Sequence, residues 1–325
     1  MPARRLSFPA AIFGQARRRA AASSLPRYDH RMHTSTKAAV NGIEIDYQIY
    51  GPANGKPLLL IMGLATQRTA WPEAWIEAFV ARGFKVITFD NRDVGLSTRF
   101  NEHPTPSPMS AFLRRRLHLP VKLAYELRDM AADANALLEY LHIAHAVVLG
   151  VSMGGMVAQR MALAYPERVE RLILLMTSSG RPWLPLPSPR VLKILLSRPV
   201  GQEQQEAAVD YLVRLFGLIG SPGYPIKPEQ HLQRARTQVE RSMAGAGAAR
   251  QLAAIVADDQ RWRELGKICV PTRVIHGIPD LMVPIRHGHD LAKRIPGASF
   301  EAVPGLGHDL PEQLAEFIAE RVASV

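Results

Sequence analysis

The chain has 325 residues, of which 47% are hydrophobic and 21% charged, as is typical of a soluble globular protein long enough for one α/β domain with an insertion. Its formal net charge of +11 alone would suggest a nucleic-acid or anionic membrane partner, but residues 1–36 hold seven arginines and one aspartate, so more than half of the excess lies there. The remainder is only mildly basic, so we predict no nucleic-acid partner.

Residues 1–36 are rich in Arg, Ala and Ser and show no folding pattern, so we expect a disordered basic N-terminal extension. Its short apolar run is broken by Pro9, fits a secretory signal poorly and is too short to cross a membrane. An organellar transit peptide and an upstream start codon, with Met32 as the working start, both remain open. We predict a cytoplasmic protein without a membrane span.

Strand signals begin after this extension. Asn41-Gly42 favours a tight turn between two strand-like stretches, which predicts an antiparallel hairpin at a sheet edge. The apolar run 58–62 predicts a strand buried on both faces. Further strands are expected over 84–89, 146–149, 169–177, 272–276 and 299–303, and helices over 72–82, 123–142, 154–165, 285–294 and 311–322.

Alternation of strands and helices predicts an α/β fold, with a mostly parallel sheet and helices on both faces. The stretch 179–258 breaks the alternation, because it opens with a Pro-rich segment and then has helical spacing. We interpret it as a helical cap inserted between two strands of a core formed by residues 37–178 and 259–325.

The strongest chemical signal is Gly150-Val151-Ser152-Met153-Gly154, which matches G-x-S-x-G. It follows an apolar strand-like run and precedes a helix-like stretch, which is the context that the nucleophile motif requires. A sharp strand-to-helix turn would hold the serine hydroxyl at the sheet edge, and the helix N-terminus would bring backbone N–H groups near it. Ser152 is therefore the predicted nucleophile; a chance match or a helix N-cap is the alternative.

A serine nucleophile needs a base, and the chain has 11 histidines. In α/β folds with this nucleophile motif, the three catalytic residues occur along the chain in the order Ser, then Asp or Glu, then His. His308 follows the strand predicted over 299–303, at the edge where sites of open α/β sheets lie, so it is the predicted base. His276 is interpreted as the end of a strand. The His287-x-His289-Asp290 pattern suggests a metal site, but residues two apart do not share a helix face, so we expect no metal and no cofactor.

Asp280 is the predicted acid that orients the histidine, because it follows the strand predicted over 272–276 in a turn. An Asx turn or a helix cap is the alternative role for this residue. Asp309 is adjacent to His308, and its side chain is expected to diverge from the ring. Asp258 and Asp259 precede the strand instead of following it.

Two backbone N–H groups are expected to form an oxyanion hole. One belongs to Met153, the residue after the nucleophile, and the other to Leu64, in the loop after the strand predicted over 58–62. Cys269 is expected to be a buried structural thiol, because no His or Gly-turn context surrounds it.

From about Gly42 to its end, the chain resembles the α/β-hydrolase superfamily. Its segment 89–98, FDNRDVGLST, looks like the D-x-R-D-x-G-x-S-T segment of aclacinomycin methylesterase-like hydrolases, and Gly150–Gly155 and Gly307–Pro311 point the same way. The usual His-Gly of the oxyanion loop is Met62-Gly63 here. Arg92 and Asp93 are interpreted as structural residues that tie loops together.

This resemblance implies a serine hydrolase that cleaves a carboxylic ester of a small molecule through an acyl-enzyme. Amide, iminopeptide or C–C cleavage and perhydrolysis use the same triad, and a non-catalytic receptor on this scaffold is a further alternative. A serine nucleophile argues against dehalogenases and epoxide hydrolases, whose nucleophile is an Asp. Within the predicted cap, Trp183 and Phe216 are candidate walls of an apolar substrate pocket, or they pack the cap onto the core. The sequence does not indicate an oligomeric state.

Overall fold

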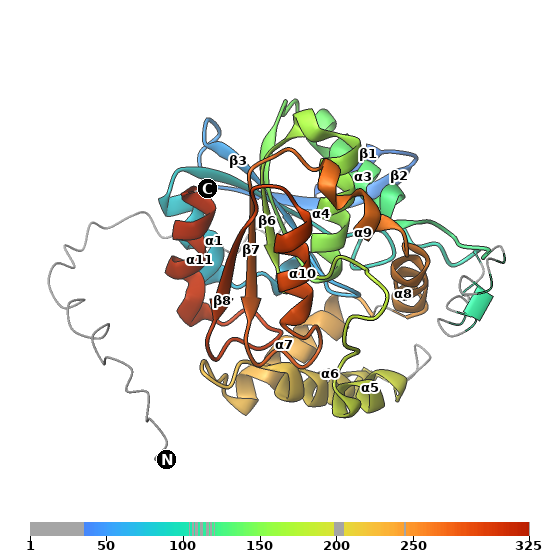
Figure 1. The fold of residues 1–325 in the computed structure, drawn as a ribbon. Helices are drawn as coiled ribbons and strands as arrows, with labels where there is room; N and C mark the ends of the chain where they lie inside the picture. The colour runs from blue at the N-terminus through green and yellow to red at the C-terminus, as the bar shows by residue number, and fades with distance from the viewer. Residues whose placement is uncertain are drawn as a thin grey trace, which may run out of the picture. The chain divides into compact units, whose positions relative to one another are not determined.

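The computed structural model describes residues 36–103, 105, 107, 110, 113–114, 117, 119, 121–197, 205–243 and 245–324 (Figure 1). A disordered extension was predicted over residues 1–36. Residues 1–35 of it, including Met32, lie outside the described part, and Thr36 is the first residue of a strand. Among the described residues, no helix is both long and apolar enough to cross a membrane.

One sheet runs through the described part of the chain, and its eight strands lie in the order β1-β2-β4-β3-β5-β6-β7-β8. The hairpin predicted around Asn41-Gly42 is confirmed, because β1 and β2 pair antiparallel on either side of this turn and both turn residues have positive φ. β2 and β4 also pair antiparallel, and every later neighbouring pair is parallel. The strands are β1 (Thr36–Val40), β2 (Ile43–Tyr50), β3 (Lys56–Ile61), β4 (Phe84–Phe89), β5 (Ala146–Val151), β6 (Val169–Leu175), β7 (Thr272–Gly277) and β8 (Ser299–Val303).

Helices cover both faces of the sheet, as predicted. Central strands supply apolar side chains to each face in alternation: Leu59 and Ile61 belong to one core cluster, and Leu58 and Leu60 to the other. The first cluster includes residues of α3 (Leu127–Tyr140), α4 (Met153–Ala164) and α10 (Arg286–Arg294). The second includes residues of α1 (Glu73–Ala81) and α11 (Ala315–Ala323). Burial on both faces explains why β3 is apolar from Leu58 to Ile61.

The helix expected over 123–142 is shorter than predicted. It begins at Leu127, because the side chains of Glu126 and Asp129 form a capping box with the backbone at the first turn. The predicted helix near 311–322 is a short 3-10 turn, η4 (Glu312–Leu314), followed by α11.

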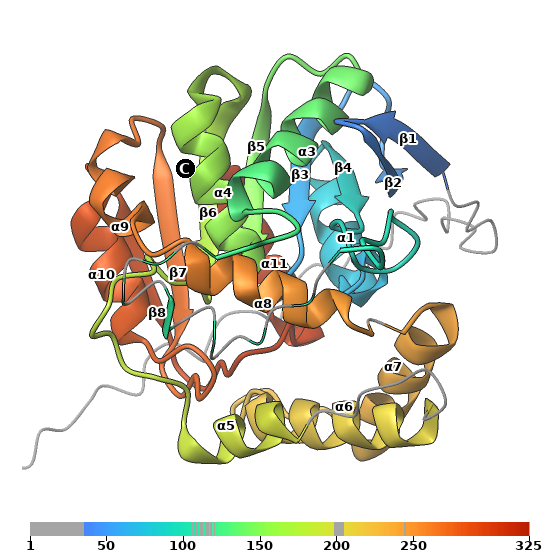
Figure 2. The ribbon, with the colours of Figure 1, turned by 90° about the vertical axis from the view of Figure 1, so that its right-hand side faces the viewer.

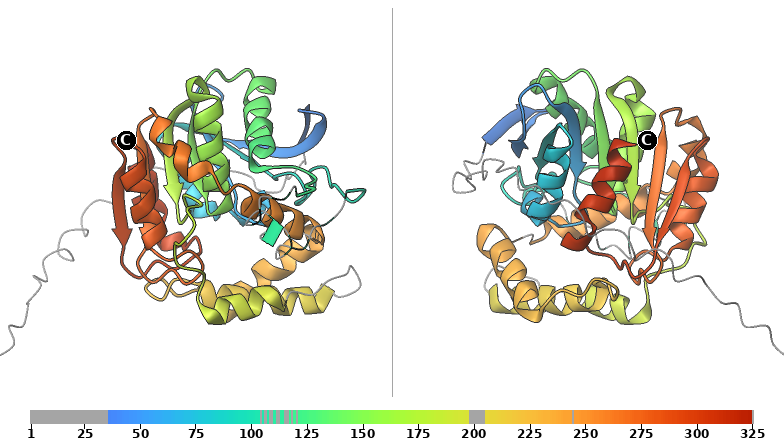
Figure 3. Two further views of the ribbon diagram at one scale, coloured as in Figure 1. Left: turned by 45° about the vertical axis from the view of Figure 1, so that its right-hand side comes forward. Right: turned by 90° about the vertical axis from the view of Figure 1, so that its left-hand side faces the viewer.

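The chain between β6 and β7 carries α5 (Pro189–Leu196), α6 (Gln205–Ile219), α7 (Pro228–Arg241), α8 (Gly247–Ala257), α9 (Arg261–Glu264) and the 3-10 turn η3 (Leu265–Lys267). Helices α5–α7, here called the cap helices, lie at one end of the sheet in all views (Figures 1, 2 and 3). α6 and α7 form a small apolar cluster of their own around Val209, Ala235 and Val239. By contrast, Ala254 of α8 belongs to a core cluster of the sheet. The division at residues 179 and 258 stays a prediction.

Cys269 was expected to be buried, and this prediction is wrong. Its side chain is exposed in the connection between η3 and β7. Its neighbour Ile268 takes the inward position and is fully buried, and the Cys269 thiol lies 3.3 Å from the carbonyl oxygen of Lys267. The apolar sequence context therefore reflects its neighbour and not the thiol.

The interpretation of Arg92 and Asp93 as structural residues is confirmed. Arg92 donates two hydrogen bonds of 2.7 Å to Asp133 of α3. Asp93 accepts two hydrogen bonds of 2.8 Å from Arg250 of α8. Both acids are buried, so each of these ion pairs ties the segment after β4 to a helix through desolvated, charge-assisted hydrogen bonds.

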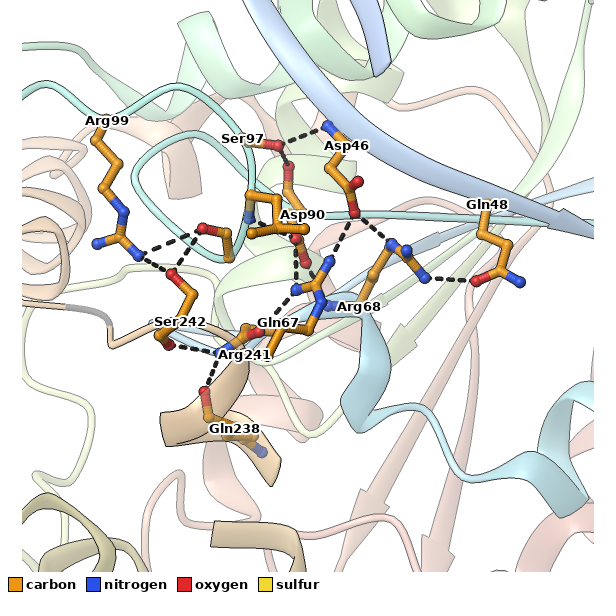
Figure 4. A network of polar contacts seen from close by, with 12 residues as sticks. Asp46, Gln48, Gln67, Arg68, Asp90, Ser97, Arg99, Gln238, Arg241 and Ser242 are labelled. Carbon is orange, nitrogen blue, oxygen red and sulfur yellow. Dashed lines mark hydrogen bonds and ion pairs between the residues drawn. The ribbon is translucent and has the colours of Figure 1, made fainter. Parts of the chain in front are cut away.

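A buried polar network joins α7 to the sheet (Figure 4). Arg241, the last residue of α7, donates to Asp46 of β2 at 2.7 Å and to Asp90, which follows β4, at 2.8 Å. Arg68 also donates to Asp46, at 2.6 Å. Both carboxylates are fully buried, so each needs an arginine to offset the loss of hydration.

Arg241→Met should destabilise the protein, because it removes the arginine side chain that binds the buried Asp90 and one of the two arginines that bind the buried Asp46. We expect the free energy of unfolding in urea to fall by about 3 kcal/mol. Arg236→Met is the matched control, because Arg236 is an exposed arginine on the same helix and should change stability by less than about 0.5 kcal/mol. Equal effects of the two substitutions would contradict this account of the network.

Candidate active site

Ser152 lies at the sharp turn between β5 and α4. Its backbone has φ 54° and ψ −118°, in a region that residues with a side chain rarely adopt. The turn is held on both sides of the chain: the Ser152 N–H donates to the Leu175 carbonyl at 3.0 Å, and the Thr177 hydroxyl donates to the Ser152 carbonyl at 2.5 Å. These bonds to the last residue of β6 and to Thr177, two residues beyond it, stabilise this backbone conformation.

Two glycines make this turn sterically possible. A Cβ atom on Gly150 would lie 2.3 Å from the carbonyl oxygen of Gly154, and one on Gly154 would lie 2.1 Å from the carbonyl oxygen of Ile61. Both distances are far below van der Waals contact with backbone that cannot move aside. The two glycines of the G-x-S-x-G motif are therefore required by packing.

The structure brings together the three side chains predicted to form the triad. His308 Nε2 lies 3.1 Å from Ser152 Oγ, and His308 Nδ1 lies 2.8 Å from Asp280 Oδ2. A carboxylate only accepts hydrogen bonds, so Nδ1 carries the proton and Nε2 is left as an acceptor for the serine hydroxyl. The three residues follow β5, β7 and β8, whose parallel pairing puts their carboxyl ends at one edge.

Asp280 is held on its other oxygen by its own turn. Oδ1 accepts the backbone N–H groups of Met282 at 2.9 Å and Val283 at 2.8 Å. Burial by itself would raise the pKa of Asp280, but the charge of His308 and hydrogen bonds from His276 and His308 outweigh burial and lower this pKa to about 2. The side chain is therefore an anion at neutral pH, as an acid that stabilises an imidazolium must be.

His276 is a neighbour of Asp280 whose contact the sequence did not predict. It is the fully buried penultimate residue of β7, and its Nε2 lies 2.7 Å from the Val283 carbonyl and 3.6 Å from Asp280 Oδ2. A carbonyl only accepts, so Nε2 carries a proton that closes the turn 280–283. The interpretation of His276 as a strand end is right, and the four-residue spacing to Asp280 is the signal that could have revealed the contact.

The predicted oxyanion loop lies against the serine. A Cβ on Gly63 would be 3.4 Å from Ser152 Cβ, so the backbone of the Met62-Gly63-Leu64 loop passes next to the nucleophile. Ala65, with φ 55°, donates its N–H to Gln251 of α8 at 2.8 Å. Gln251 is fully buried and in turn donates to the Arg92 carbonyl at 2.8 Å. No sequence pattern indicates this glutamine as a support for the loop.

The two candidate pocket residues differ in exposure. Trp183 is 82% exposed, so the structure does not bring it into a buried wall near Ser152. Phe216 is half-buried on α6, where it packs against the apolar cluster of the cap helices, and its ring centre lies 6.3 Å from that of His231. Phe216 therefore remains the better placed of the two.

The H-x-H-D pattern on α10 forms ordinary hydrogen bonds instead of a ligand cluster. His287 lies 2.7 Å from Ser178 Oγ and 2.8 Å from the Pro185 carbonyl, while His289 is exposed and stacks near Phe300. Asp290 binds Arg294 at 2.7 Å. Throughout the described ranges, no group of three or more His, Cys, Asp or Glu side chains is arranged to hold a metal ion.

Comparisons with known proteins agree with this fold. A family model described as the alpha/beta hydrolase fold matches residues 56–313. A rhodomycin D methylesterase of Streptomyces peucetius is 28% identical over 82% of this chain and 90% of its own. A poly(3-hydroxyalkanoate) depolymerase of Ectopseudomonas oleovorans is 31% identical over 81% of each chain. A solved enol-lactonase of Burkholderia xenovorans has a TM-score of 0.66 at 26% identity and covers 88% of this chain and 98% of its own.

The matched span contains Ser152, Asp280 and His308 and most of the sheet. The methylesterase and the enol-lactonase cover 82% and 88% of this chain, so the likeness is not confined to the nucleophile motif. The chain therefore belongs to the α/β hydrolase fold family of enzymes.

Proposed function

We propose that this protein is a serine hydrolase that cleaves a carboxylic ester of a small molecule through an acyl-enzyme, with Ser152 as nucleophile, His308 as base and Asp280 as the acid that orients it. The observation that carries the proposal is the unbroken chain of hydrogen bonds from Ser152 Oγ to His308 Nε2, at 3.1 Å, and from His308 Nδ1 to Asp280 Oδ2, at 2.8 Å. Each link has the geometry that its proton transfer or orientation step needs.

In the acylation step, His308 Nε2 takes the hydroxyl proton as Ser152 Oγ attacks the ester carbonyl. The carbonyl oxygen becomes negative and is stabilised by the backbone N–H groups of Met153, at the start of α4, and of Leu64. As the tetrahedral intermediate collapses, the imidazolium gives its proton to the leaving alcohol. The anionic Asp280 stabilises the imidazolium throughout this step.

In the deacylation step, water replaces the alcohol. His308 takes a proton from the water, and the resulting hydroxide attacks the acyl carbonyl held on Ser152. The same two N–H groups stabilise the second oxyanion, and the proton returns to Ser152 Oγ when the acid leaves. No cofactor is needed for either step.

An ester is the preferred substrate class for two reasons. The relatives named above as a methylesterase and a lactonase carry ester cleavage in their names. In addition, an alcohol is an easier leaving group than an amine or a carbanion and needs only the one general acid that His308 supplies. Phe216, half-buried among the cap helices, is the residue we assign to the wall that contacts the apolar part of the ester.

Ser152→Ala should abolish ester hydrolysis without unfolding the protein. Loss of the nucleophile should lower kcat on a short-chain aryl ester by about 10⁴-fold or more. Ser197→Ala, at the exposed C-terminal end of α5, is the matched control and should keep wild-type turnover. Mass spectrometry of the wild type during turnover should show one acyl group on Ser152. Wild-type turnover by purified Ser152→Ala would refute the proposal.

Asp280→Asn should lower kcat by about 10³- to 10⁴-fold, because an amide does not stabilise the imidazolium. It should also change the pH dependence of stability. The pKa of Asp280 is lowered from its usual 3.8 to about 2, so its ionised form stabilises the folded state above pH 3.8, and this contribution is lost as pH falls toward 2. In urea unfolding, the wild type should lose about 2 kcal/mol more than Asp280→Asn over that range. Parallel pH curves for the two proteins would contradict the assigned ionisation.

Phe216→Ala should change substrate preference. Because Phe216 is assigned to the pocket, its loss should lower kcat/KM for long-chain esters about tenfold or more relative to the shortest ester. Trp183→Ala removes a large apolar side chain that is 82% exposed and should leave the preference unchanged. A uniform loss across all chain lengths in Phe216→Ala would show that Phe216 only packs the cap helices.

A further inference from the structure

The loop that carries His308 is bonded to the segment 219–223, which consists of the last residue of α6 and the first residues of the connection to α7. The His308 N–H donates to the Ile219 carbonyl at 2.7 Å, and the Gly223 N–H donates to the Gly305 carbonyl at 2.9 Å. Ile219 is the last residue of α6, so its carbonyl lacks a helical partner and the N–H of His308 provides one. The connection between two cap helices thus contacts the backbone of the predicted base directly.

The two segments meet backbone to backbone because glycines face each other. A Cβ on Gly307 would lie 2.5 Å from the carbonyl oxygens of Ile219 and Gly220. A Cβ on Gly223 would lie 2.8 Å from the Cα of Gly305. Only glycine fits where two backbone segments pass this close to each other. We therefore expect a shift of the segment 219–223 to move the His308 loop with it.

Ser221 is the side chain at the centre of this contact. It is 4% exposed, its hydroxyl oxygen accepts the Gly307 N–H at 2.8 Å, and its hydroxyl donates to the Asp309 carboxylate. One hydroxyl therefore binds the residue before His308 and the residue after it. Among the bonds described, the Asp309 carboxylate binds Ser221, whereas the imidazole of His308 binds Asp280.

Asp309 depends on Ser221 because its surroundings are poor in water. Burial raises the pKa of Asp309, whereas hydrogen bonds from Ser221 and the charge of Arg234 oppose this rise. Its second carboxylate oxygen has no hydrogen-bond partner among the described residues. Ser221 binds this partly buried carboxylate through both its hydroxyl and its backbone N–H, so the Asp309 side chain is held to Ser221.

We propose that Ser221 is a positioning residue for His308: its hydroxyl clamps residues 307 and 309 to the connection between α6 and α7, so that the cap segment sets the distance from His308 Nε2 to Ser152 Oγ. This role rests on the proposed function, in which His308 is the base. In this proposal, the connection between α6 and α7 helps to position the catalytic base in addition to shaping the substrate pocket.

The reason to expect a large effect is the sensitivity of proton transfer to distance. Nε2 and Oγ are 3.1 Å apart, within hydrogen-bond reach but with little to spare. A displacement of about 1 Å can cost about 100-fold in rate. Without the Ser221 hydroxyl, the hydrogen bond between His308 and Asp280 remains and keeps the imidazole oriented. It does not hold the backbone of Gly307 and Asp309 in place.

The test compares Ser221→Ala, Asp309→Ala and the double variant in the full chain. Three quantities are measured: kcat and KM on an aryl ester, and the second-order rate constant for phosphonylation of Ser152 by a fluorophosphonate probe. Each single variant should lower both kcat and the phosphonylation rate by about 10- to 100-fold, with KM within about twofold of wild type. The double variant should be no slower than the slower single variant, because both remove one clamp. Asp309→Asn keeps an oxygen acceptor for Ser221 and should recover most of the rate.

Ser242→Ala is the matched control. Ser242, just after α7, also donates its hydroxyl from the cap region to the core, to the Gly95 carbonyl at 2.8 Å, but it touches no residue of the His308 loop in the bonds described. It should lower the unfolding temperature without changing kcat or phosphonylation. A wild-type phosphonylation rate in folded Ser221→Ala would overturn the proposal; if that variant does not fold, a wild-type rate in Asp309→Ala would do so.

Failure of this inference differs from failure of the proposed function. If the wild type is labelled by the probe, Ser152→Ala is not, and Ser221→Ala is labelled at the wild-type rate, only the clamp is wrong. If the wild type itself is not labelled and Ser152→Ala retains turnover, the serine mechanism is wrong and Ser221 has no base to position.

Discussion

Parallel pairing of β5 with β6, β6 with β7 and β7 with β8 is the constraint on which the site depends. Parallel strands end at the same edge of a sheet, so loops that are far apart in sequence are forced to emerge side by side. Ser152 and His308 are separated by 156 residues and still meet at 3.1 Å. The layers of helices bury both faces of these strands, which keeps the edge rigid enough to hold such a distance.

Buried charge is the second theme of this molecule. Asp46, Asp90 and Asp280 are all nearly or fully removed from water, and each is held by several donors. The direction in which the carboxyl pKa shifts depends on the groups that bind each carboxylate. Burial raises the pKa of Asp90 despite the nearby Arg241, whereas two imidazoles and two backbone N–H groups keep Asp280 ionised. The first arrangement fixes helix α7 to the sheet, and the second is suited to stabilising a developing imidazolium.

The chain between β6 and β7 supports the site from two directions. Gln251 of α8 holds the loop next to Ser152 through the Ala65 N–H, and the connection between α6 and α7 holds the His308 loop through its own backbone. Since a hydrogen bond within a protein replaces one to water, both contacts restrict geometry more than they add net stability. In this protein the inserted helices and the predicted catalytic loops are therefore mechanically linked.

Local sequence alone determined the strands, most helices and the Ser152 turn, because apolar periodicity, turn residues and the G-x-S-x-G glycines act over only a few residues. Chain order and strand ends also led to His308 and Asp280. Tertiary structure decided the rest: the support from Gln251, the bonds of Ser221 and the exposure of Trp183 and Cys269. Polar contacts across long separations leave no periodic pattern, and the exposure of an apolar side chain depends on which segments fold over it, which no local stretch of sequence specifies.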